Sequence, residues 1–249
     1  MSCLSLLMDH APNWYSVSGR GNGSVDGVCV VVDETAAKDK EYSVTIEQIG
    51  EAVYARETRL GEKLPKVCYN RHIMPNGYFC LGLSAGHLVK DVKGARDWWS
   101  NLSQFLRLQG VASSTGRWPR TMELDHGQAG HYHRRALDAA AKLGVSEEYE
   151  LALLGKPSWT TSLLSGDGMH VINGRAPCPV GCTRAGRHIL RGECCAKNSL
   201  LELLQNERLR AISLDRFWEN VRTNEQMACC GTMISCPLRA ARRLEAQRK

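Results

Sequence analysis

Residues 70–83, NRHIMPNGYFCLGL, constrain this 249-residue chain more than any other segment. Within them, Pro-Asn-Gly at residues 75–77 predicts a tight turn, because proline fixes φ while asparagine and glycine tolerate left-handed backbone. The apolar residues around Cys80 predict a brief extended segment directly after the turn. This would hold the Cys80 thiol at a surface, with His72 eight residues upstream and able to fold back towards it. A thiol beside an imidazole and free backbone N–H groups suits acyl transfer.

Residues 76–81, Asn-Gly-Tyr-Phe-Cys-Leu, resemble the active-site flap of ubiquitin-conjugating enzymes, where His-Pro-Asn precedes Asn-Gly-x-Ile-Cys-Leu. The first half of the motif departs, since Asn70, Arg71 and His72 stand where the family has His, Pro and Asn. This departure is similar to the bacterial branch of the superfamily. The sequence His-Gly-Gln-Ala-Gly at residues 126–130 is also similar to that branch.

The resemblance covers residues 1–155 and implies an α+β fold, a UBC-like antiparallel meander with flanking helices. It implies a cysteine acyltransferase that accepts a ubiquitin-like modifier from an activating enzyme as a thioester on Cys80. The modifier would then pass to an amine of an acceptor protein. The resemblance places such an enzyme in the cytoplasm, in a bacterial conjugation system of antiphage defence.

The resemblance leaves several roles open at the site. His72 takes the place of the family's oxyanion-binding Asn, so it could donate to the oxyanion, deprotonate the incoming amine, or only brace the flap. His126 is expected to line the cysteine cleft, with Asp125 beside it. On composition alone Cys80 could instead be an inert buried residue. The spacing of His126, His131 and His133 does not match a helical metal pair.

Seven of the eleven cysteines fall between residues 178 and 236. Residues 1–8 do not resemble a signal peptide, so free thiols or metal ligands are expected rather than a disulfide framework. Cys-Pro-Val-Gly-Cys at residues 178–182, followed by a Cys-Cys pair, resembles a short zinc knuckle. The alternative is a set of buried reduced thiols. The expected donors to structural zinc are Cys178, Cys182, Cys194, Cys195, Cys229, Cys230, Cys236 and His188.

The distribution of charge divides the chain close to where the cysteine-rich part begins. Residues 175–249 carry a net charge of +7 and the remainder −1, which together give +6. The expected domains are a conjugating domain over residues 1–155, a linker over 156–176, and a mainly helical cysteine-rich module over 177–249. The arginines of that module could dock an acidic partner, although a solvated basic face is the simpler interpretation.

Local patterns predict the elements. Gly and Ser predict a loop over residues 16–26. Strands are expected over 27–33, 42–49 and 64–69, and helices over 95–108, 131–143, 147–154 and 199–210, with two more beginning at Ser213 and Pro237. The long N-terminal helix of the family has no expected counterpart before Pro12. No apolar run approaches the ~18 residues that would span a membrane.

Two other functions fit parts of the sequence. The chain could be a non-catalytic scaffold that binds the modifier, as the loss of the motif Asn suggests. It could also be a zinc-dependent nucleic-acid binder, although the C-terminal part has only Phe217 and Trp218 as aromatic residues for base stacking. The expected partners are the modifier, the activating enzyme and the acceptor protein, with neither nucleic acid nor membrane.

Overall fold

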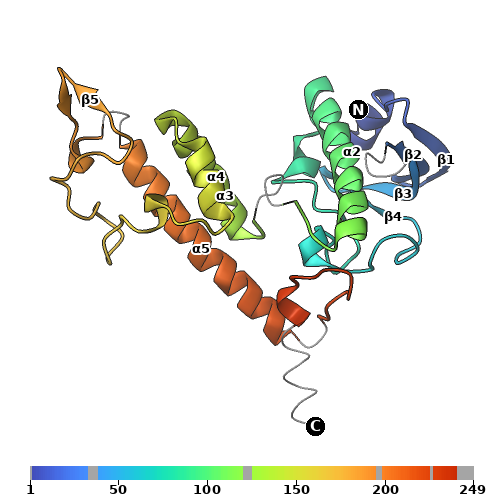
Figure 1. Cartoon of the computed structure of the whole chain (residues 1–249). Helices are drawn as coiled ribbons and strands as arrows, with labels where there is room; N and C mark the ends of the chain where they lie inside the picture. The colour runs from blue at the N-terminus through green and yellow to red at the C-terminus, as the bar shows by residue number, and fades with distance from the viewer. Residues whose placement is uncertain (1, 33–38, 120–124, 195–197, 225–226, 240–249) are drawn as a thin grey trace, which may run out of the picture. The chain divides into compact units, whose positions relative to one another are not determined.

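The computed structural model describes residues 2–32, 39–119, 125–194, 198–224 and 227–239. It divides into two compact units, Met1–Pro119 with Val221–Lys249, and Arg120–Asn220 (Figure 1). The α+β class expected from the sequence is confirmed, with a four-stranded antiparallel sheet in the first unit. None of the described helices combines the length and the apolar character needed to cross a membrane.

The sheet of the first unit is a meander in the order β1-β2-β3-β4. Its strands are β1 (Tyr15–Gly21), β2 (Ser24–Val31), β3 (Lys40–Ile49) and β4 (Ala52–Glu57). The loop expected over residues 16–26 is therefore wrong, because β1 and the start of β2 occupy it. Gly21 pairs with Ser24 across an Asn-Gly hairpin in which Gly23 has a φ of +77°. Asn-Gly is a strong hairpin signal, and pairing with β2 outweighs the low strand propensity of β1.

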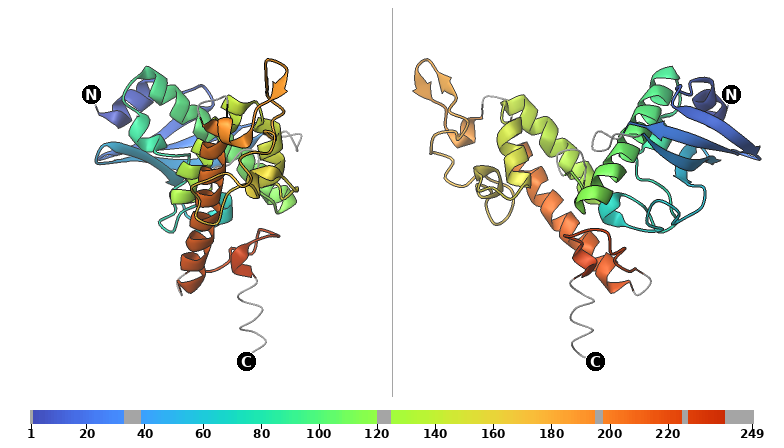
Figure 2. Two further views of the ribbon diagram at one scale, coloured as in Figure 1. Left: turned by 90° about the vertical axis from the view of Figure 1, so that its left-hand side faces the viewer. Right: turned by 45° about the vertical axis from the view of Figure 1, so that its right-hand side comes forward.

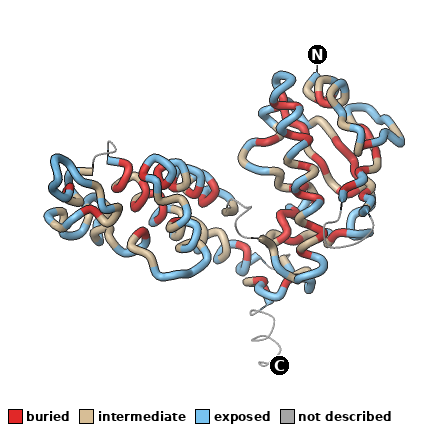
Figure 3. Tube along the Cα trace, turned by 45° about the horizontal axis from the view of Figure 1, so that its top comes forward, coloured by how far each residue is buried: buried red, intermediate tan, exposed pale blue. Residues whose placement is uncertain are grey.

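Two helices build the core of this unit with the sheet. Asp91 caps α2 (Val92–Thr115) by accepting a hydrogen bond of 2.7 Å from the Gly94 N–H. The helix places Trp98, Leu102 and Phe105 in the buried cluster, and Figure 3 shows buried positions recurring along it. A helix that the sequence did not suggest, α1 (Cys3–Asp9), joins the same cluster. The Trp99 indole N–H donates to the Leu7 carbonyl at 2.9 Å and ties the two helices together.

The second unit is mainly helical (Figure 2). Its elements are α3 (Gln128–Leu143), α4 (Ser146–Leu153), η4 (Trp159–Thr161), the β5–β6 hairpin (Thr183–Arg184 and Arg187–His188), η5 (Arg191–Glu193) and α5 (Ser199–Thr223) as far as Asn220. Alanines of α3 pack with Tyr149 of α4 and with Leu200, Leu203 and Leu204 of α5. The two helices expected after residue 199 are one, because the apolar face continues past Ser213.

The expected boundaries differ from the compact units. Helices α3 and α4, assigned by sequence to the conjugating domain, belong to the second unit, and the last described segment belongs to the first. A compact unit is not by itself an independently folding domain, so the boundaries at residues 155 and 177 stay a prediction. The strand expected over residues 64–69 is wrong, since Cys68 forms only an isolated bridge with Ile73. Residues 237–239 are helical, as expected for a helix that begins at Pro237, and the rest of that expected helix lies outside the described residues.

Candidate active site

The flap turns where the sequence predicts it. The Gly77 N–H donates to the Met74 carbonyl at 2.8 Å, which closes the turn around Pro75 and Asn76. Gly77 has a φ of +82°, and a Cβ there would lie 2.5 Å from the Leu60 side chain, so both conformation and space favour glycine. Beyond the turn, bridges join Tyr78 to β4 and Phe79 to Ile73. The turn therefore delivers Cys80 from a fixed backbone.

Cys80 and His72 meet at the base of this flap. The Cys80 N–H donates to the His72 carbonyl at 2.8 Å, and the two side chains are also hydrogen-bonded. Burial alone would raise the pKa of the partly buried Cys80 thiol. The hydrogen bond and charge of the His72 imidazole, together with the backbone N–H of Gly82, instead lower that pKa below its ordinary value. A thiol in these surroundings is prepared to react as a thiolate.

Aromatic packing and an unusual backbone conformation hold His72 in place. Its φ of 54° and ψ of 36° are left-handed, and its side chain is buried. The ring centroid lies 5.0 Å from that of Trp118. Trp118 in turn contacts Phe105 of α2, and Phe105 stacks on Phe79 at 4.5 Å. The imidazole is thus fixed by the same cluster that anchors the flap.

Arg71, at the position of the motif proline, fastens the flap to α2. Arg71 is 2% exposed, and its guanidinium donates to the Gln109 side chain at 2.7 Å and to Ser113 Oγ at 2.8 Å. Gln109 returns a bond of 2.7 Å from its amide to the Arg71 carbonyl. A fourth contact, at 3.4 Å, reaches Thr232 near the end of the described chain. The sequence pattern did not predict this role of Arg71. The signal available in the sequence was Gln109, a polar residue on the apolar stripe of α2.

His126 lies in the second unit, on the aromatic side chains of α5. Its ring stacks on Phe217 with centroids 5.0 Å apart and meets the edge of Trp218 at 5.5 Å. Its expected place in the cleft of Cys80 stays a prediction. The two aromatics that could have stacked on nucleic-acid bases are engaged with this histidine instead.

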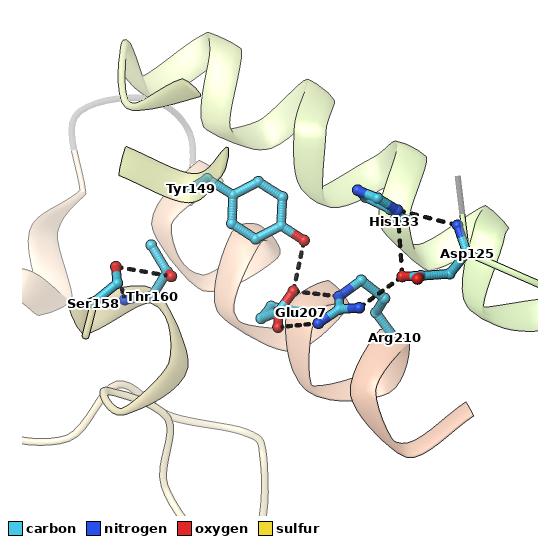
Figure 4. Close-up of polar contacts among 7 residues, drawn as sticks. All are labelled: Asp125, His133, Tyr149, Ser158, Thr160, Glu207 and Arg210. Carbon is cyan, nitrogen blue, oxygen red and sulfur yellow. Dashed lines mark hydrogen bonds and ion pairs between the residues drawn. The ribbon is translucent and has the colours of Figure 1, made fainter. Parts of the chain in front are cut away.

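Asp125 belongs to a polar network between α3, α4 and α5 (Figure 4). Arg210 donates to Asp125 Oδ2 at 2.6 Å and to Glu207 at 2.7 Å, and Glu207 accepts from the Tyr149 hydroxyl at 2.6 Å. His133 Nδ1 lies 3.3 Å from Asp125 Oδ2. Burial alone would raise the pKa of Asp125, but the hydrogen bond with His133 and the charge of Arg210 lower it to about 2. Asp125 is therefore an internal ion-pair partner.

The expected zinc donors fall into two sets. In the second unit, Cys178, Cys182 and Cys194 join one apolar cluster. The Ile189 N–H donates to the Cys182 carbonyl at 2.9 Å, next to the β5–β6 hairpin. His188 is exposed in that hairpin, and Cys195 lies outside the described residues.

The other set of expected donors lies in the first unit with a cysteine that the sequence did not single out. Cys230 Sγ lies 2.9 Å from Cys68 Sγ, and Cys229 is hydrogen-bonded to Cys236. The hydrogen bond with Cys68 does most to lower the pKa of Cys230, to about 5, with Arg71 contributing. Across the described parts of the chain, no group of three or more His, Cys, Asp or Glu side chains is placed to hold a metal ion.

The fold and the thiol on its flap define a class, an α+β protein with a candidate acyl-accepting cysteine. Two family models name that class more closely. One, described as "Prokaryotic E2 domain", matches residues 18–120, and one described as "Cysteine-rich domain, C-terminal to E2 domain" matches residues 125–238. Together they are consistent with a bacterial E2-like protein and support a ubiquitin-conjugating-like role. No curated protein and no solved structure matches the chain.

Proposed function

We propose that this protein conjugates a ubiquitin-like modifier, carrying it as a thioester on Cys80. The observation that carries the proposal is the contact between the Cys80 thiol and His72, with the lowered pKa that follows from it. A flap cysteine kept for packing alone would not need an imidazole and a backbone N–H at its sulfur. The match to the prokaryotic E2 domain supports the same role.

The proposed chemistry has two acyl transfers. In the first, the Cys80 thiolate attacks the thioester carbonyl that joins the modifier to the activating enzyme, and the activating enzyme leaves as a thiolate. In the second, an amine of the acceptor protein attacks the new thioester, loses a proton, and expels Cys80 as a thiolate. His72 and the Gly82 N–H stabilise Cys80 in its thiolate form before the first transfer and after the second.

The match to the cysteine-rich family model is compatible with structural zinc in the second unit, although no described group of residues there is arranged to hold a metal ion. We propose that Cys178, Cys182 and Cys194, with Cys195, hold the ion, since thiolates are the donors that structural zinc prefers. Metal analysis of the purified protein should find zinc that Cys182→Ser removes and Cys3→Ser retains. Equal zinc content in the two variants would contradict this assignment.

The test of the main proposal combines the protein with a candidate ubiquitin-like modifier, the activating enzyme that charges that modifier, and ATP. The wild type and the matched control Cys3→Ser should form an adduct that a reducing agent releases. Cys80→Ala should form none, and Cys80→Ser should form one that resists reduction, because an oxyester replaces the thioester. If the activating enzyme carries the modifier as a thioester but none is transferred to this protein, the result would favour the non-catalytic scaffold that only binds the modifier.

The partners of this reaction would be the modifier, the activating enzyme and an acceptor protein, as the E2 domain implies. The antiphage setting rests on the resemblance alone and stays a prediction. The salt dependence of binding to a mixed-sequence DNA would detect the rival nucleic-acid function.

A further inference from the structure

Two cysteines 162 positions apart in sequence have their sulfur atoms closer together than two thiolates bound to the same metal ion would be. Cys68 Sγ and Cys230 Sγ are separated by 2.9 Å. Two thiolates on one tetrahedral zinc would stand about 3.8 Å apart, given Zn–S bonds of about 2.3 Å. A disulfide requires about 2.05 Å, so the two sulfurs need to approach by less than about 1 Å. The described residues hold no group placed to bind a metal here.

We propose that Cys68 and Cys230 form a reversible disulfide, a modification site distinct from the thioester cysteine. The two thiols differ in access, because Cys68 is buried whereas Cys230 is partly exposed. Cys230 is therefore the one that meets an oxidant. The guanidinium of Arg71 contacts Thr232, whose hydroxyl lies 3.1 Å from Cys230 Sγ, so a fixed positive charge stands near the pair.

The step balances with a peroxide as oxidant. The Cys230 thiolate attacks one peroxide oxygen, the O–O bond breaks, and a sulfenic acid and water result after protonation. The Cys68 thiol then attacks the sulfenic sulfur, its proton leaves with the hydroxyl as a second water, and the S–S bond forms. Two thiols and one peroxide yield one disulfide and two waters. A dithiol reductant reverses the reaction by thiol–disulfide exchange.

The location gives the bond a structural consequence. Cys68 begins the turn that carries Arg71 and His72, since the Arg71 N–H donates to the Cys68 carbonyl at 2.9 Å. Cys230 lies in the segment after residue 226, which also contacts Asn70 through the Ser235 carbonyl. Oxidation would covalently fix this segment to the base of the flap.

The sequence makes the bond easy to map in the full-length protein. Trypsin cleaves after Lys66 and Arg71 to release residues 67–71, where Cys68 is the only thiol. It also cleaves after Arg222 and Arg239 to release residues 223–239, which contain Cys229, Cys230 and Cys236. The reduced protein is treated with hydrogen peroxide, alkylated in denaturant, digested and fragmented in a mass spectrometer.

The expected product joins the two peptides through Cys68 and Cys230, with the loss of two hydrogens, and disappears on reduction. Cys29→Ser should retain it, while Cys68→Ser and Cys230→Ser should each lose it. A Cys68 thiol that stays open to alkylation, a dominant bond among Cys229, Cys230 and Cys236, or a zinc ion lost in Cys68→Ser would each overturn the proposal. The wild-type map needs no variant to fold and no modifier, so its outcome is independent of the thioester assay.

Discussion

His72 and Cys80 are linked twice, through a backbone hydrogen bond of 2.8 Å and through their side chains. His72 makes both links from a left-handed backbone conformation, with a φ of 54° and a ψ of 36°. Asparagine, which stands at this position in the ubiquitin-conjugating motif that the flap resembles, is among the few residues that tolerate such backbone. His72 therefore combines this left-handed backbone with an imidazole that can stabilise a thiolate.

Replacing His72 separates its effect on the backbone conformation of the flap from its effect on the Cys80 thiolate. His72→Ala should slow alkylation of Cys80 by iodoacetamide at pH 7 by about tenfold, because the thiolate loses its charged partner. His72→Asn should preserve folding but not this reactivity. The rate is followed by mass spectrometry as a function of pH, with the exposed His87→Ala as control. Equal alkylation in the wild type and His72→Ala would show that the imidazole only braces the flap.

Arg71 offers a second prediction at this scale. Arg71→Met should lower the free energy of unfolding by about 3 kcal/mol, because Gln109 and Ser113 lose a charged donor in a buried place. Urea unfolding measures the change. The control is Arg107→Met, at an exposed position of α2, the helix that carries Gln109 and Ser113. Its free energy of unfolding should differ little from that of the wild type. Similar losses in both variants would argue against a specific role for Arg71.

Helices α3, α4 and α5 are joined both by apolar packing and by the buried ion pairs of Figure 4. Breaking one partner of a buried pair leaves an uncompensated charge, which costs more than the intact pair contributes. The network therefore makes the packing of these helices sensitive to pH.

The pKa of Asp125 sets the direction of that sensitivity. It falls from an ordinary 3.8 to about 2 on folding, so the carboxylate contributes about 2 kcal/mol above pH 4, which is lost as the pH falls towards 2. Asp125→Asn should therefore be less stable at pH 7, by a margin that shrinks in acid. Circular dichroism against urea at several pH values tests this, with the exposed Asp138→Asn of α3 as control. A margin independent of pH would exclude the ionic explanation.

Across the whole molecule, the chain returns to its first unit at Val221, in the last turn of α5. The Ile234 N–H donates to the Gly116 carbonyl at 2.8 Å, and Thr232 and Ser235 contact the turn before Cys80. Residues more than 100 positions apart thus support one site. We call residues 227–239 the returning segment. The family model for the cysteine-rich domain ends at residue 238 and so includes nearly all of it.

Removal of the returning segment should loosen the flap. A chain ending at residue 224 should show amide exchange at Cys68 and Ile73 at least about tenfold faster than the full chain, because local opening becomes easier. A chain ending at residue 239 should exchange like the full chain. Hydrogen–deuterium exchange with mass spectrometry measures both. Unchanged protection in the shorter chain would show that the flap is stable without this segment.

Local features of the sequence determined the turn at residues 75–77, the apolar stripe of α2 and the placement of Cys80 beside His72. Each depends on residues within about ten positions of one another, where backbone preferences and helical periodicity act directly. The sequence did not predict strand β1, because its Ser-Gly-rich residues have little strand propensity. Only pairing with β2 makes this segment a strand.

Only the tertiary structure decided how Arg71 is held and which thiols gather. Arg71 meets Gln109 and Thr232, and Cys68 meets Cys230, through contacts that span 38 to 162 positions in sequence. No spacing pattern encodes such pairs, because the return of the chain after α5 is a consequence of how the whole molecule packs. The C-terminal cysteines that the sequence offered as zinc donors, for one ion or two, are divided between two compact units for the same reason.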